Sequence, residues 1–212
     1  MSRTQSIALA AIVAIVAVTA GIASARWLLE HQAGAPPITA TATLLLPPRP
    51  VPPLALVDQA NRPFDTQRLR GSWTFVFFGF TSCPDVCPVT MAALAQTRKL
   101  LADLPEQTRP QVVMISVDPQ RDTPERLATY LKVFDPAFVG ATGTKPAIDE
   151  LAQRMGVLAA VRPLDGGESY TVDHTTSLFL VGPDATVRAL FSAPHEPEKI
   201  AADYRRIAAA GT

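Results

Sequence analysis

Residues 73–88 read WTFVFFGFTSCPDVCP, and this stretch decides how the chain folds. Its first half, Trp73–Phe80, is a continuous apolar and aromatic run, which is typical of a β-strand buried on both faces. Its second half carries both cysteines of the chain, Cys83 and Cys87, directly after that strand. The stretch therefore predicts a central strand in an α/β sheet, with two thiols at its carboxyl end and at the start of the next helix.

Working outward, strand-like and helix-like segments alternate along the chain. Strands are predicted over 54–57, 112–117, 138–141, 157–161, 177–181 and 186–191, and helices over 89–104, 123–134, 146–155 and 198–210. Gly182-Pro183-Asp184-Ala185 is a turn that joins the last two strands as a hairpin. This order predicts an α/β fold in which helices cover both sides of the sheet.

The amino-terminal quarter differs in composition from the rest. Its charged residues up to position 53 are Arg3, Arg26, Glu30 and Arg49, whereas the whole chain has 19 basic and 19 acidic residues. Residues 7–25 contain no charge, and as a helix they would be roughly 28 Å long, about the thickness of a bilayer's hydrocarbon core. We expect a transmembrane anchor at 7–25, although Ala23-Ser24-Ala25 also resembles a signal-peptide cleavage site.

These features predict four parts. Residues 1–6 form a cytoplasmic tail, 7–25 the anchor, 26–53 a proline-rich linker that holds the domain off the membrane, and 54–212 the folded domain. The short tail carries no Arg-rich transit peptide, which favours a bacterial inner membrane with the domain in the periplasm. The zero formal net charge argues against a nucleic-acid partner. Two cysteines are too few for a disulfide-stapled scaffold or a Cys₄ zinc site.

The Cys83–Cys87 spacing brings the two sulfurs together. Positions i and i+4 project from one face of a helix, so the pair could bind one soft metal ion or form a labile disulfide. A helix amino terminus lowers thiol pKa values, so we expect both cysteines to ionise readily. A metal site needs a further ligand. His174 precedes the 177–181 strand and is a candidate, whereas His195 is expected in a surface or capping role.

Four stretches carry a resemblance to a known family. Phe78–Pro88 (FGFTSCPDVCP) resembles the signature of the Sco/SenC family of copper proteins, and three further matches are Val113–Glu125, Phe134–Gly143 and Val172–Pro183. The resemblance covers nearly all of residues 54–210. It implies a thioredoxin-like fold behind one membrane anchor and one bound copper ion. It also implies a role in assembling the binuclear copper centre of cytochrome c oxidase subunit II, alongside other copper chaperones.

By that resemblance, Cys83 and Cys87 match the two thiolate ligands and His174 matches the imidazole ligand. Two thiolates and an imidazole suit Cu(I) and also accept Cu(II), whereas zinc would require a fourth donor such as water. Asp85 and Asp173 are the acidic residues nearest in sequence, and either could orient His174 or tune the metal's charge. Ser82 stands where many family members have His, which changes local polarity and removes no ligand.

Two functions follow from this constellation. The first is a copper metallochaperone that transfers its ion by ligand exchange. The alternative is a membrane-tethered thiol–disulfide oxidoreductase, in which Cys83 and Cys87 are a redox-active pair that reduces an acceptor's cysteines. His174 favours the first, because oxidoreductases of the thioredoxin type have a proline at that place. A peroxidase would need Thr or Ser three residues before the reactive Cys83, where Phe80 stands.

Overall fold

The computed structural model describes residues 13–26, 37–164 and 169–211. The chain divides into two compact units, Met1–Pro37 and Ile38–Thr212. In the first unit, residues 13–26 are helical. The anchor expected at 7–25 begins in residues 7–12, which lie outside the described residues. In the described ranges, no helix is both long enough and apolar enough to cross a membrane.

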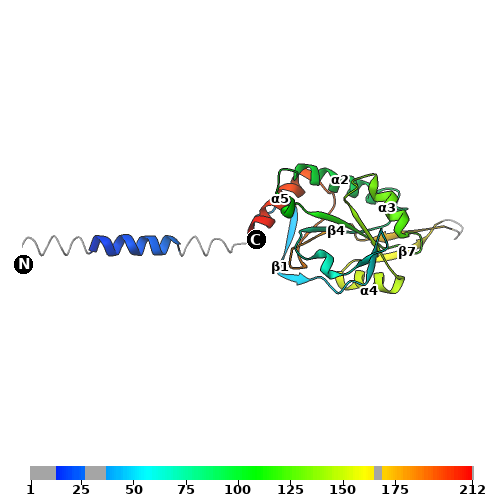
Figure 1. The fold of residues 1–212 in the computed structure, drawn as a ribbon, viewed down its shortest axis with the longest axis horizontal. Helices are drawn as coiled ribbons and strands as arrows, with labels where there is room; N and C mark the ends of the chain where they lie inside the picture. The colour runs from blue at the N-terminus through cyan, green and yellow to red at the C-terminus, as the bar shows by residue number, and fades with distance from the viewer. Residues whose placement is uncertain (1–12, 27–36, 165–168, 212) are drawn as a thin grey trace, which may run out of the picture. The chain divides into compact units, whose positions relative to one another are not determined.

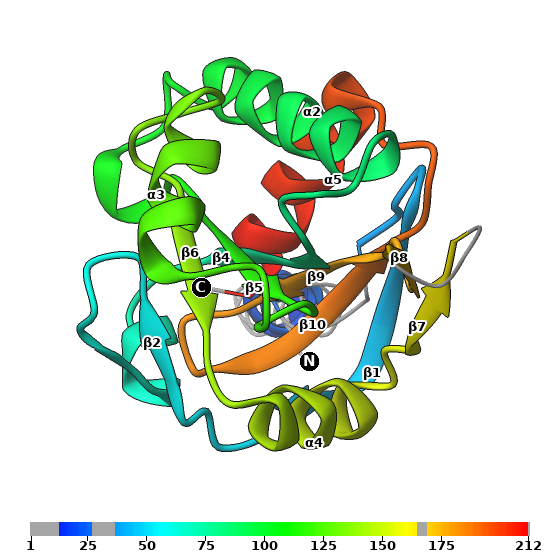
Figure 2. The same cartoon turned by 90° about the vertical axis from the view of Figure 1, so that its right-hand side faces the viewer.

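The second unit is a mixed α/β fold built on one large sheet (Figures 1 and 2). Its strands are β1 (Ala42–Pro50), β2 (Leu56–Asp58), β3 (Pro63–Phe64), β4 (Thr74–Gly79), β5 (Gln111–Ser116), β6 (Val139–Thr142), β9 (Leu178–Val181) and β10 (Thr186–Phe191), in the order β1-β10-β9-β4-β5-β6-β2-β3. A second sheet pairs β7 (Ala159–Pro163) with β8 (Tyr170–His174). Strands β4, β5 and β6 run parallel, and β9 lies antiparallel to β4.

Helices cover both faces of this sheet. They are α2 (Val86–Leu100), α3 (Pro124–Lys132), α4 (Lys145–Met155) and α5 (Pro197–Ala210), and two short 3₁₀ turns lie at Thr66–Leu69 and Glu106–Thr108. In Figure 2, α2, α3 and α5 lie on one side of the sheet and α4 on the other. All six residues of β4 are buried between these layers, as its apolar run predicts. The predicted α/β architecture with a terminal β9–β10 hairpin is therefore confirmed.

Local sequence explains where the helices begin and end. Thr123 caps α3 by accepting a hydrogen bond from the Arg126 amide, and Thr144 caps α4 through the Ala147 amide. Each helix has a proline in its first turn, where no intrahelical amide bond is lost. Helix α4 ends at Met155, and the next residue is Gly156, whose positive φ of 74° favours a residue without a side chain. These helices follow β5 and β6 and set the position of the loops at the carboxyl ends of those strands.

The predicted linker is wrong over residues 38–53. Strand β1 pairs antiparallel with β10 at the edge of the main sheet, and Val51 is buried in the core. The edge position accounts for this, since a proline without an amide hydrogen is tolerated where one side of a strand has no neighbour. The folded unit therefore begins at Ile38 rather than at Leu54.

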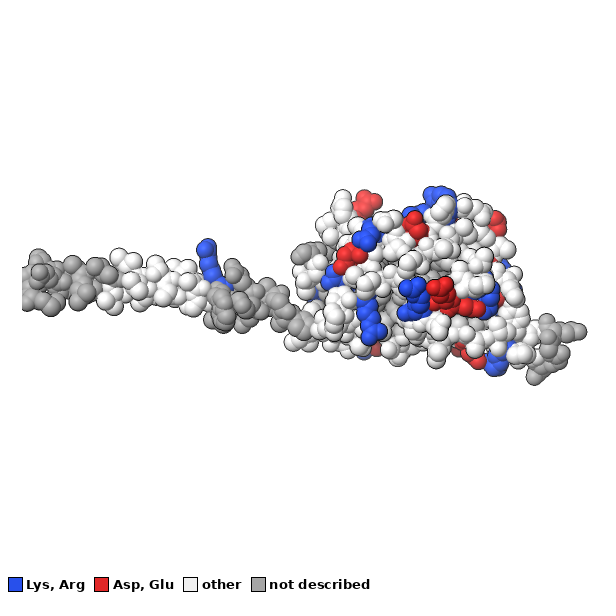
Figure 3. All heavy atoms as spheres, turned by 90° about the horizontal axis from the view of Figure 1, so that it is seen from below, with Lys and Arg blue, Asp and Glu red and all other residues white. Residues whose placement is uncertain are grey.

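The charged surface does not separate by sign on the face shown in Figure 3. Acidic and basic side chains are intermixed there. Many charged side chains of the folded unit form ion pairs, for example Lys145 with Asp149 and Arg154 with Glu150. A nucleic-acid binding surface carries clustered positive charge, and this face has none of that pattern. The absence of a nucleic-acid partner stays a prediction.

Candidate metal centre

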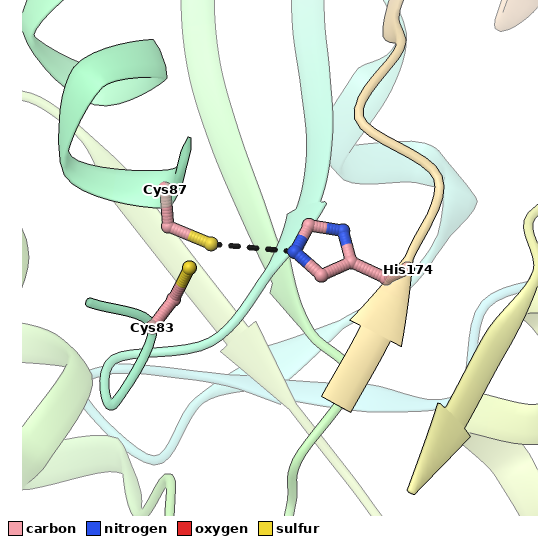
Figure 4. Close-up of side chains that lie close together, drawn as sticks. All are labelled: Cys83, Cys87 and His174. Atoms are coloured by element: carbon pink, nitrogen blue, oxygen red, sulfur yellow. Dashed lines mark hydrogen bonds between the residues drawn. The ribbon is translucent and has the colours of Figure 1, made fainter. Parts of the chain in front are cut away.

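The two cysteines lie where the chain leaves β4. Cys87 is the second residue of α2 and is fully buried. Cys83 precedes the helix in a turn closed by a hydrogen bond from its amide to the Phe80 carbonyl, 3.3 Å long. The expectation that both residues share one helical face is therefore wrong. The sulfurs meet because the turn folds Cys83 back against the first turn of α2 (Figure 4).

His174 completes a compact group with these sulfurs. The ligand atoms of Cys83, Cys87 and His174 all lie within 4.8 Å of one another. His174 ends strand β8 and directs Nε2 to the Cys87 sulfur at 3.4 Å (Figure 4). Bonds of roughly 2.0–2.3 Å from a metal to nitrogen or sulfur place two ligands about 4 Å apart. The three donors therefore fit around a single ion, and Cys87 Sγ and His174 Nε2 are already as close as two ligands of one ion.

The tautomer of His174 suits a ligand. Its Nδ1 lies 2.9 Å from the Thr175 carbonyl oxygen, which can only accept a hydrogen bond. In the neutral ring Nδ1 therefore carries the proton, and the lone pair of Nε2 faces the sulfurs. Burial lowers the pKa of His174, which favours this neutral form. Phe77 and Phe80 pack edge-on against the imidazole, each with a centroid distance of 5.8 Å, and fix its plane.

Neither acidic residue proposed from the sequence orients His174. Asp173 is exposed and pairs with Arg162 at 2.9 Å, because successive residues of a strand point to opposite faces. Asp85 is exposed too, and no capping hydrogen bond from its side chain to α2 exists in the described structure. The Thr175 carbonyl takes the orienting role, and a backbone atom leaves no trace in a sequence motif.

Burial reverses the expected chemistry of Cys87. The helix amino terminus was expected to lower the pKa of this thiol, but burial raises it, and the neighbouring Cys83 and Asp122 raise it further. The buried thiol is therefore held protonated in the metal-free protein. Burying a charged thiolate costs free energy. A bound metal cation removes that cost, because it takes the place of the proton and neutralises the thiolate directly. This environment favours metal binding over free thiolate chemistry at Cys87.

The backbone of β4 passes close to the Cys87 sulfur at Gly79, the last residue of the strand, and this position requires a glycine. A Cβ at this position would lie 2.5 Å from Phe77 Cε1 and 3.1 Å from Cys87 Sγ. The first distance is shorter than van der Waals contact, so a side chain would displace Phe77 or Cys87. Phe77 also supports His174, so Gly79 serves both halves of the site. The one sequence feature that could have indicated this role is the FGF stretch, in which Gly79 interrupts an aromatic run.

A buried carboxylate fixes the loop that carries Cys83. Asp122 accepts hydrogen bonds from the Thr81 amide at 3.0 Å, the Thr81 hydroxyl at 2.6 Å and the Ser116 hydroxyl at 2.7 Å. An aspartate just before a helix commonly caps that helix. The carboxylate instead reaches back to the preceding β–α loop, which no spacing rule reveals.

Arg121 ties the strand of His174 to the main sheet. Its guanidinium donates to the Tyr170 carbonyl at 3.0 Å and lies 3.8 Å from the centroid of that ring. Tyr170 in turn donates to Asp118 at 2.8 Å, and Asp118 also pairs with Arg121. Strand β8 belongs to the small second sheet, so these contacts supply a connection that sheet hydrogen bonds do not. His195 lies outside the metal group and contacts Thr90 at 3.3 Å.

Comparison with known proteins agrees with this geometry. The SCO1/SenC family model matches residues 46–209. The chain belongs to the SCO1/SenC family. Its relatives include the mitochondrial SCO1 homologue of Homo sapiens, with 38% identity over 71% of this chain and 50% of that protein. A protein of Stutzerimonas stutzeri whose name ascribes copper binding to it is 44% identical, over 71% and 74% of the two chains. The chain thus spans about half the length of the human relative.

Solved SCO1/SenC structures share the fold and some contain copper. The copper-bound ScoI structure from Bradyrhizobium japonicum has a TM-score of 0.67 and 33% identity, covering 74% of this chain and 99% of that one. The copper-bound structure of yeast Sco1 also has a TM-score of 0.67, with 27% identity over 73% and 86%. The fold is thus the thioredoxin-like fold of this family, with a Cys-Cys-His group at which copper can bind.

Proposed function

We propose that the chain is a copper metallochaperone that holds one copper ion through Cys83, Cys87 and His174. The observation that supports it most is the convergence of two sulfurs and the unprotonated Nε2 within 4.8 Å. Soft thiolates with one imidazole favour Cu(I) and accept Cu(II). Three protein ligands leave an approach open for an acceptor's sulfur, so copper can leave by stepwise ligand exchange.

The acceptor we propose is the binuclear copper site of cytochrome c oxidase subunit II, with copper supplied by other copper chaperones. The family resemblance supports this assignment. A partly exposed Cys83 beside a buried Cys87 gives the exchange a direction. The outer sulfur can release the ion to an incoming thiolate first, while the inner sulfur and His174 still hold it.

Membrane tethering belongs to the same proposal. We place the anchor at 7–25 and the folded unit in the periplasm of a bacterium, on the strength of the uncharged amino-terminal run and the preceding Arg3. A tether confines donor and acceptor to one surface and raises their effective concentration. Membrane fractionation and protease digestion of spheroplasts test this. Recovery of the full chain in the soluble fraction would overturn it.

Copper titration tests the site itself. The reduced full chain should bind one Cu(I), and His174→Ala should weaken binding by more than about 100-fold, since a direct ligand matters more than the outer groups that cost 10–100-fold. His195→Ala is the matched control, because this half-buried histidine lies outside the ligand group. It should stay within about threefold of wild type. Unchanged affinity in His174→Ala would refute the ligand assignment.

The second candidate is thiol–disulfide exchange, which the proximity of two free cysteines supports. The two thiols of this chain would become a disulfide while an acceptor's disulfide becomes two thiols, so electrons and protons balance. Incubation of the copper-loaded chain with the soluble copper domain of subunit II separates the two functions. Copper transfer supports the chaperone. Reduction of the acceptor's cysteines without copper transfer would support the oxidoreductase instead.

A further inference from the structure

Helix α3 turns one face towards the loop that carries Cys83. Arg126, in the first turn, donates hydrogen bonds to the Thr81 hydroxyl at 2.7 Å and the Ser82 hydroxyl at 2.9 Å. Asp122, just before the helix, holds Thr81 from the same side. Side chains four residues apart lie above one another on a helix, so Tyr130 follows Arg126 on this face. Side chains on a helix lean towards its amino terminus, so Tyr130 leans towards the end of α3 that contacts this loop.

The Tyr130 hydroxyl is buried and has no hydrogen-bond partner among the described residues. Its ring is held by Phe134, whose centroid is 5.2 Å away. A buried hydroxyl without a partner costs free energy, so such groups are rare and require an explanation. Burial raises the pKa of Tyr130, so the hydroxyl keeps its proton and stays a donor. Among the described residues this donor forms no hydrogen bond, to either sulfur or to any other acceptor.

We propose that the Tyr130 hydroxyl donates a hydrogen bond to the Cys83–Cys87 thiolates when copper is bound, and thereby stabilises Cu(I) over Cu(II). The inference rests on the proposed function. Copper binding deprotonates both thiols and creates a strong acceptor where the metal-free site offers only neutral sulfur. A donor to a ligand sulfur withdraws electron density from it, and hydrogen bonds to sulfur tune the potentials of copper–thiolate sites. Tyr130 is a positioning residue, since it acts through the sulfurs.

The test is Tyr130→Phe in the full chain, which removes one oxygen atom and keeps the ring. Cu(I) affinity should fall about tenfold, the equivalent of one charge-assisted hydrogen bond. The sulfur-to-Cu(II) charge-transfer band should move to longer wavelength, because sulfur without its donor gives up an electron more easily. The thermal midpoint of the metal-free protein should not fall, since the hydroxyl has no partner there.

Tyr204→Phe is the matched control. Tyr204 is a buried tyrosine on α5 whose hydroxyl donates to the Thr108 carbonyl, and it carries no ligand contact. This variant should lose thermal stability while its Cu(I) affinity stays within about twofold and its Cu(II) band stays in place. Tyr130→Phe should therefore change copper binding and leave thermal stability unchanged, whereas Tyr204→Phe should do the reverse. Unchanged affinity and an unchanged band in Tyr130→Phe would overturn the inference while leaving the copper function intact.

A metal-free measurement decides the inference if the wild-type chain binds no copper and the proposed function fails. The Cys83–Cys87 pair is equilibrated with glutathione at a pH at which the ultraviolet absorbance of thiolate shows that the thiols have ionised. Loss of a donor that stabilises the thiolates should make the pair several-fold harder to reduce in Tyr130→Phe than in wild type. Equal equilibrium constants for the two proteins would then overturn the role of Tyr130.

Discussion

Two buried carboxylates hold two different segments against the same sheet. Asp122 binds the Thr81 amide and hydroxyl and so fixes the metal loop. Asp203, on α5, accepts hydrogen bonds from the amides of residues 40–42, at distances of 2.7–3.0 Å, and so fixes the start of β1. Both carboxylates accept hydrogen bonds from backbone amides, but the segments that they hold differ. One carboxylate positions chemistry and the other closes the fold, so the two roles can be separated by mutation.

Asp122→Asn should give the largest effect. The amide keeps the volume of the carboxylate, but its NH₂ group faces donors from Thr81 and Ser116 and leaves buried hydrogen bonds unmade. We expect a loss of about 3 kcal/mol in the free energy of unfolding. Cu(I) affinity should fall by about tenfold or more as the Cys83 turn loosens. Urea unfolding and copper competition measure the two quantities.

The control for this change is Asp135→Asn, because Asp135 is a half-buried carboxylate that pairs with Arg98 and lies outside the metal group. It should leave Cu(I) affinity at the wild-type value. If Asp122→Asn lowers stability but copper binds with unchanged affinity, then Asp122 supports the fold alone and the contrast with Asp203 disappears.

Asp203→Asn should destabilise the protein without touching the metal centre. The substitution removes charge from an acceptor of three backbone amides, and we expect a loss of about 2 kcal/mol, or roughly 4–8 °C in thermal midpoint. Cu(I) affinity should stay at the wild-type value. Asp103→Asn, an exposed carboxylate paired with Arg205, should leave the midpoint near wild type. A change in copper affinity in Asp203→Asn would show that the two ends of the fold are coupled.

The stability difference between the wild type and Asp203→Asn should depend on pH. Burial alone would raise the pKa of Asp203, but the amides of Ala40, Thr41 and Ala42 outweigh it and lower the pKa below the ordinary value of 3.8. A carboxyl with a lowered folded-state pKa contributes its full stability above its unfolded value and loses it as pH falls through the folded value. The stability difference between wild type and Asp203→Asn should therefore be constant from about pH 5 to 7 and shrink below pH 4. Urea midpoints across this range measure it, and a constant difference at acid pH would contradict the assignment.

The contrast also explains what the sequence could predict. Cysteine and histidine are rare and chemically distinct, so Cys83, Cys87 and His174 stood out as candidates, and the family resemblance matched them to ligands before the structure brought them together. The partners of Asp203 are backbone amides, which every residue but proline carries, and they lie more than 160 positions away. Strand β1 was missed for the same reason, since its prolines indicate a linker unless the partner strand β10 is known.

Ser82→His should have the smallest effect on copper affinity and stability. It tests how firmly Asp122 and Thr81 hold the metal loop. The family resemblance implies His at this place in many members, and the Ser82 hydroxyl accepts one hydrogen bond, from Arg126 at 2.9 Å. Arg126 keeps its second bond, to the Thr81 hydroxyl, so the loop should stay anchored through Thr81 and Asp122. We expect Cu(I) affinity within about threefold of wild type and a stability change below about 1 kcal/mol. Thr81→Val, which removes the hydroxyl shared by Arg126 and Asp122, should cost more on both counts. If Ser82→His instead gains affinity by tenfold or more, the histidine enters the coordination sphere, and the three-ligand description would have to be replaced by one with four.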